Sequence, residues 1–104
     1  MSEKKRAGAA AAPAEEAKPI PGLIPGRTVH YVMDTPLAAG EAPKVRPAVV
    51  VVVWDRLTGV SNLQVFVDGT NDGYAAGQGT VWKTSCRYSE GREPGTWHWP
   101  PRAS

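Results

Sequence analysis

Cysteine, phenylalanine and histidine are scarce in this 104-residue chain, which has one, one and two of them. The single cysteine, Cys86, excludes an internal disulfide and a zinc site built from several thiolates. No apolar run approaches the roughly 20 residues that a helix needs to cross a bilayer. The basic residues at the start are followed by alanines and acidic residues, not by the apolar core of a signal peptide. We therefore expect a protein made in the cytoplasm, without membrane association, bound metal or cofactor.

An excess of charge of one sign is also missing. The chain has 12 basic and 10 acidic residues, which give a formal net charge of +2. Proteins that bind nucleic acid without sequence preference neutralise phosphates with an excess of lysine and arginine. The balanced charge therefore predicts that nucleic acid is an unlikely partner.

The composition divides the chain into an N-terminal arm, residues 1–26, and a β domain, residues 27–104. The arm is rich in alanine and proline, and its large apolar residues are Ile20, Leu23 and Ile24. Such a segment cannot bury enough apolar surface to become ordered alone. It is either a flexible tail or an arm that docks on a neighbouring protein, with Ile20, Leu23 and Ile24 as the partner-binding anchors.

The rest of the sequence has the pattern of β-strands. Apolar residues alternate with other residues in segments 27–33 and 60–68. The run of β-branched residues between them, at 45–54, predicts a central strand covered on both faces. The predicted strands cover residues 27–33, 45–54, 60–68, 79–88 and 95–99. We predict an all-β fold, a small five-stranded antiparallel barrel or sandwich of the size of SH3 or OB domains, with an extended N-terminal arm.

The segment DGTNDG, residues 68–73, places Asp68 and Asp72 at two ligand positions of a calcium-binding loop. The twelfth position of such a loop needs a bidentate glutamate, and here it is Gly79. Asparagine, aspartate and glycine are also the residues that ordinary turns prefer. We therefore predict a turn at this segment and no metal site.

No catalytic residues are predicted. Cys86, His30 and His98 have no spacing typical of a nucleophile and its base or of a catalytic zinc site. A lone cysteine within a strand usually behaves as a small apolar residue. The sequence therefore indicates a protein that is not an enzyme.

The aromatic residues allow two interpretations. They either fill a thin core or form a stacking platform for single-stranded nucleic acid, with Arg46, Arg56, Lys83 and Arg87 as candidates for phosphate contacts. Acidic residues are interspersed among these basic ones, and this pattern favours the structural interpretation.

The C-terminal segment GTWHWP, residues 95–100, concentrates two of the four tryptophans. Alternate residues of a strand point to the same side, so Trp97 and Trp99 share one face and His98 lies on the other. The two tryptophans either close the barrel against Tyr31 or the valine-rich strand, or belong to an interface. His98 is expected to be exposed.

Five blocks of the sequence resemble a family of small proteins encoded by tailed bacteriophages. They are GRTVHYV, RPAVVVVVWD, NLQVFVDGTND, GTVWKTSCRYSE and GTWHWP, and the last is the most specific. The resemblance covers about residues 26–100 and excludes the arm. It implies phage origin and an accessory role in the virion, such as capsid decoration or cementing.

This resemblance and the two-part organisation suggest a non-enzymatic virion structural protein that stabilises the head. The β domain would dock on the capsid, and the arm would cross neighbouring subunits. The expected partners are the major capsid protein or another virion protein, with self-association as a second option. The expected location is the virion, assembled in the host cytoplasm. The alternative is a small phage binding module for single-stranded nucleic acid or a host protein, acting in the infected cell.

Overall fold

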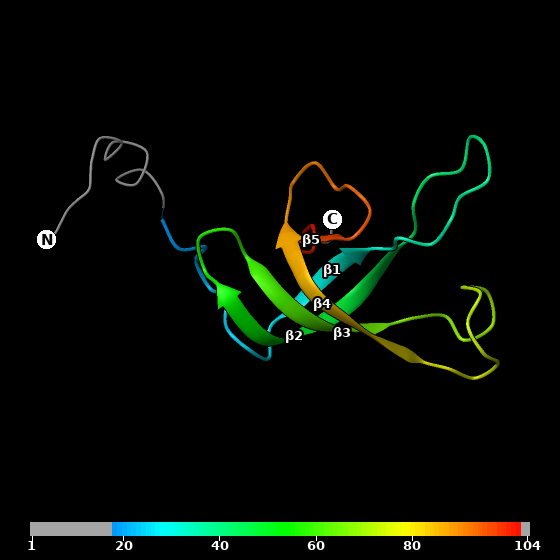
Figure 1. The fold of residues 1–104 in the computed structure, drawn as a ribbon, viewed down its shortest axis with the longest axis horizontal. Coiled ribbons are helices and arrows are strands. Elements are labelled where there is room, and N and C mark those ends of the chain that lie inside the picture. The colour runs from blue at the N-terminus through cyan, green and yellow to red at the C-terminus, as the bar shows by residue number, and fades with distance from the viewer. Residues whose placement is uncertain (1–17, 103–104) are drawn as a thin grey trace, which may run out of the picture.

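The computed structural model describes residues 18–102 and contains a closed barrel of five strands (Figure 1). The strands are β1 (Thr28–Val32), β2 (Val45–Asp55), β3 (Val60–Phe66), β4 (Thr80–Tyr88) and β5 (Thr96–His98). The predicted all-β class and the five strands are confirmed. None of the described residues forms a helix of the length and apolar character that crossing a membrane requires.

The barrel is mixed rather than fully antiparallel. The consecutive pairs β1–β2, β2–β3 and β3–β4 are antiparallel. Strand β5 closes the barrel between β1, to which it is antiparallel, and β4, to which it is parallel. The antiparallel prediction is therefore wrong at the β4–β5 pair. The reason is the path of residues 89–95, which do not make a tight hairpin. Their last residue, Gly95, adopts φ +86° and donates its N–H to the carbonyl of Val32 in β1 (2.8 Å).

The second half of β2 has an unexpected neighbour. Its first half pairs with β1. The residues that precede β1 pair with the next part of β2. The carbonyl of Val50 accepts the N–H of Gly26 (2.7 Å), and the N–H of Val50 donates to the carbonyl of Arg27 (2.9 Å). Further along, the N–H of Ile20 donates to the carbonyl of Arg56 (2.9 Å). Residues 20–27 therefore run along β2 where β1 no longer covers it.

This contact changes the role of the predicted anchors. Leu23 is 1% exposed and belongs to the core, and Ile20 is partly buried against that core. Only Ile24, at 50% exposure, presents its side chain to solvent. Leu23 is thus part of the barrel and is not available to a partner. The reason is that residues 20–27 lie along the part of β2 that β1 leaves uncovered, where the Leu23 side chain packs into the core. The rest of the predicted arm, residues 1–17, lies outside the described residues.

The core fills the barrel interior with side chains from all five strands and from residues 20–27. Trp97 in β5 is fully buried and lies opposite Tyr31 of β1 in the strand register. Its indole Nε1–H donates to the carbonyl of Gly59 (2.8 Å). The buried residues of this core are Leu23, Val29, Tyr31, Met33, Ala48, Val50, Leu63, Val65, Cys86 and Trp97.

Gly59 is the residue that lets Trp97 pack so closely. It has φ +81°, and a Cβ at this position would lie 2.6 Å from the Cβ of Tyr88 and 3.1 Å from the Trp97 ring. Both the backbone conformation and the lack of space therefore require glycine here.

Leu23→Ala tests whether residues 20–27 belong to the folded domain. Truncating a fully buried leucine removes apolar contacts and leaves a cavity, so we expect the free energy of unfolding to fall by about 2–5 kcal/mol. The neighbouring Ile24→Ala, at an exposed position, is the matched control and should change it by about 0.5 kcal/mol or less. Urea denaturation of both variants gives the comparison. Equal, small effects would show that Leu23 does not pack in the core.

Candidate functional site

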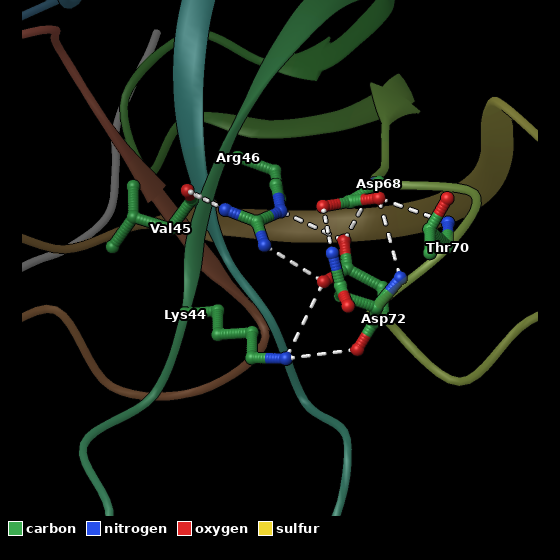
Figure 2. A network of polar contacts seen from close by, with 7 residues as sticks. Lys44, Val45, Arg46, Asp68, Thr70 and Asp72 are labelled. Carbon is green, nitrogen blue, oxygen red and sulfur yellow. Dashed lines mark hydrogen bonds and ion pairs between the residues drawn. The ribbon is translucent and has the colours of Figure 1, made fainter.

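The turn predicted at residues 68–73 holds a partly buried ion pair (Figure 2). The Arg46 guanidinium donates from Nε and Nη2 to the two carboxylate oxygens of Asp72, each at 2.7 Å. The Lys44 ammonium lies 3.5 Å from Asp72 Oδ1. The Asp72 side chain is only 1% exposed. These hydrogen bonds, led by those from Arg46, hold the pKa of Asp72 well below its usual range although burial opposes the shift.

The carboxylates of this turn are occupied by donors within the protein. Asp72 Oδ2 also accepts the backbone N–H of Asp68 (2.8 Å). The Asp68 carboxylate accepts the N–H of Thr70 (2.9 Å) and both the N–H and the side-chain amide of Asn71. Within residues 18–102, no group of three or more His, Cys, Asp or Glu residues could hold a metal ion. The turn therefore serves as a structural corner that fixes the loop to the start of β2.

The four basic residues considered for phosphate contacts do not form one surface. Arg46 is bound to Asp72, and Lys83 pairs with Asp34 (3.1 Å). Arg46 lies near the start of β2, whereas Arg56 directly follows its end. Arg56 and Arg87 have exposed side chains. Two of the four positive charges are thus already neutralised by carboxylates.

His98 is buried, and the expectation that it would be exposed is wrong. It is 3% exposed, because the chain that follows β4 lies close to it, and Glu90 and Arg92 line one pocket together with His98. Its ring lies edge-on to His30, with 5.8 Å between the ring centroids. Neither ring nitrogen has a hydrogen-bond partner in the described part of the chain. Burial, and next the positive charge of Arg92 and the neighbouring His30, lower the pKa of His98.

Cys86 and the tryptophans of the C-terminal segment also have structural positions. The Cys86 thiol is buried and free, and burial raises its pKa to about 11, which disfavours the nucleophilic thiolate. Trp97 is a core residue, as closure of the barrel requires. Trp99 is partly buried and contacts the Trp97 ring edge-on (5.2 Å between centroids), while the Arg27 guanidinium lies 5.0 Å from its ring.

Unused apolar surface lies on the outside of β2, β3 and β4. In the strand register Val49, Gln64 and Trp82 are neighbours on this outer side, as are Val52 with Asn62 and Phe66 with Thr80. Trp54 joins them through a hydrogen bond to Asn62. We name this set the neutral face because none of its members is ionisable: Val49, Val52, Trp54, Asn62, Gln64, Phe66, Thr80 and Trp82.

The large side chains of the neutral face are well exposed. The exposed fractions are 62% for Trp54, 49% for Trp82 and 46% for Phe66. A monomeric protein rarely leaves several such side chains together on one surface unless they bind something. The neutral face is therefore the strongest candidate for a functional site in the described structure.

Sequence reasoning treated these aromatic residues as core or as a nucleic-acid platform and missed the neutral face. One signal was available, because Leu63 and Val65 alternate with Gln64 and Phe66 and so assign Phe66 to the side away from the core. The continuous valine run of β2 carries no such alternation. The outward position of Trp54 also depends on a register irregularity between Val53 and Asp55, which the alternation of residue types in the sequence cannot reveal.

A double-mutant cycle between Arg46 and Asp72 measures what the ion pair contributes. Asp72→Ala leaves the guanidinium without its partner and should lower the free energy of unfolding by about 1.5–3 kcal/mol, the usual range for hydrogen bonds to charged groups. Arg46→Met combined with Asp72→Ala should cost less than the sum of the single changes. Additive effects in chemical denaturation would contradict a direct interaction.

The buried His98 should make the protein less stable in mild acid. Its pKa is lower in the folded than in the unfolded chain, where histidine has a value of about 6.5. Below that value the unfolded state binds the proton more readily, so stability is complete above about pH 6.5 and decreases as the pH falls. We expect the urea concentration at the midpoint of unfolding to be lower at pH 5 than at pH 7.5.

His98→Phe keeps a ring in this position and removes both ring nitrogens, and it should lose most of this pH dependence. His30→Phe is the matched control and should retain most of it, because burial is the largest cause of the lowered pKa and His30 the smallest. If the urea midpoint changes with pH equally in the wild type and in His98→Phe, the pH dependence comes from other groups.

Comparisons with protein-family models, with curated proteins and with solved structures find no match to this chain. The function of the barrel must therefore be argued from its own side chains.

Proposed function

We propose that this protein is a non-enzymatic structural protein of a bacteriophage virion, a capsid decoration or cement protein. It binds the major capsid protein or another virion protein and thereby stabilises the head. The observation that carries the proposal is the neutral face, where Trp54, Phe66 and Trp82 are exposed on a barrel whose core is already complete. Association with another protein is the usual role of such a surface. The virion assignment rests on the resemblance of residues 26–100 to small phage proteins.

Within residues 20–27, fewer side chains are available to a partner than the predicted arm would offer. Because Leu23 is in the core and Ile20 packs against it, Ile24 alone of the three predicted anchors is free for a neighbour. Ile24 borders a shallow apolar groove of about 380 Å³, which is lined by Leu23, Ile24, Pro25, Val51, Val52, Val53 and Arg56.

The second candidate is a module that binds single-stranded nucleic acid in the infected cell. The exposed aromatic residues favour it, since bases stack on such side chains. The charges support it less, because Arg46 and Lys83 are bound to Asp72 and Asp34. The neutral face itself offers no cation for a phosphate.

The protein content of purified phage particles distinguishes the two. A decoration or cement protein should be present in stoichiometric amounts, and particles made without it should lose their DNA at lower temperature. The purified protein should bind those particles and restore their stability. Absence from particles, together with salt-dependent binding to single-stranded DNA, would support the second candidate instead.

A further inference from the structure

We propose that the neutral face is the surface that docks on the virion partner, and that Trp54 inserts into an uncharged, apolar pocket of that protein. This inference rests on the proposed function and specifies where and how the partner binds. It follows from the continuity of the face, the fixed position of Trp54 and the distribution of charge.

The neutral face is continuous across three strands. Gln64 in β3 lies between Val49 of β2 and Trp82 of β4 in the register. Phe66 lies beside Thr80, which is two residues before Trp82 on the same side of β4. The aromatic side chains therefore belong to one surface of one sheet, which a single partner surface can cover.

Trp54 is held in place although it is the most exposed of the three aromatic residues. Its Nε1–H donates to Asn62 Oδ1 (3.0 Å), and the same oxygen accepts the backbone N–H of Ser85 (2.9 Å). Ser85 has φ +54°, a conformation that costs free energy in a residue other than glycine. Asn62 thus links β2, β3 and β4 at this point. A side chain that is ordered before binding loses less conformational entropy in the complex.

The hydrogen bond to Asn62 also defines the chemistry of the partner. A buried indole N–H needs an acceptor, and Asn62 already supplies it within this chain. The partner therefore needs no polar group for Trp54, and a hydrocarbon pocket suits the remainder of the indole. Tryptophan is among the residues that most often dominate binding energy in protein interfaces.

Charge favours a protein over a nucleic acid as the occupant. The centres of protein interfaces are poor in charged residues and rich in aromatic ones, as this face is. Lys83 belongs to the same strand as Trp82 but pairs with Asp34. Arg56 is an exposed cation at the margin of the face, where it lines a groove together with Val52. No charge lies among the aromatic residues themselves, which is where a stacked nucleic acid would need contacts to phosphate.

The test measures binding of purified variants to phage particles assembled without this protein. Trp54→Ala should weaken binding by about 30-fold or more, which corresponds to a hot-spot contribution of 2 kcal/mol. Trp82→Ala should weaken it as well. Leu57→Ala is the matched control, because Leu57 is 50% exposed but lies in the β2–β3 connection outside the face, and it should bind like the wild type. Circular dichroism and thermal melting confirm that each variant is folded.

Asn62→Ala separates positioning from contact. It keeps the Trp54 ring and removes the acceptor that fixes it, so binding should weaken by less than in Trp54→Ala. If Trp54→Ala and Trp82→Ala bind as well as the wild type does, the proposed docking surface is wrong while the proposed function stands. If the wild-type protein does not bind particles at all, the proposed function is wrong and the docking inference is overturned with it.

Two other occupants would also overturn the proposal. Light scattering that shows a dimer of the wild type and a monomer of Trp54→Ala would mean that a second copy covers the face. Binding of single-stranded DNA that Trp54→Ala abolishes would mean that bases stack there. Monomeric wild-type protein, with particle binding that depends on Trp54 and no affinity for DNA, is the result that supports the proposal.

Discussion

The burial of Trp97 is the constraint on which this barrel depends. The strand that carries it, β5, has only three residues, and its pairings with β1 and β4 involve two residues each. So short a ladder contributes few hydrogen bonds to closure. The Trp97 indole is fully buried, contacts the Tyr88 ring with 4.9 Å between the ring centroids, and donates a hydrogen bond to the carbonyl of Gly59. A single aromatic residue thus joins the last strand to the β2–β3 connection and makes the sheet a closed structure.

The two ends of β2 are stabilised by different interactions. Near its end, Leu23 from the N-terminal segment fills the core, and the stabilising effect there is the removal of apolar surface from water. At its start, Arg46 binds Asp72 through two short hydrogen bonds, and the stabilisation there depends on the protonation state of a carboxylate. Mild acid acts first on the buried His98, since the pKa of Asp72 is held far lower.

The strands could be predicted from the sequence because alternation and β-branched runs are local properties, as in Leu63 and Val65 of β3. Three features could not, because they depend on contacts between distant segments. The parallel β4–β5 pair depends on the path of residues 89–95, which also buries His98. The burial of Leu23 depends on the part of β2 that β1 leaves uncovered. The position of Val52 and Trp54 in the neutral face depends on two register irregularities in β2, at Val50/Val52 and Val53/Asp55.

The antiparallel course of residues 20–27 along β2 has a mechanical consequence. Ile20 bonds to Arg56 and Arg27 to Val50, so the chain leaves the barrel in the direction in which β2 ends. A pull on Lys18 in that direction loads these hydrogen bonds in shear, and they must break together with the extraction of Leu23 from the core. A pull at right angles would open them one after another from Ile20. The resistance of this attachment to force therefore depends on the direction in which the chain before Ile20 is pulled.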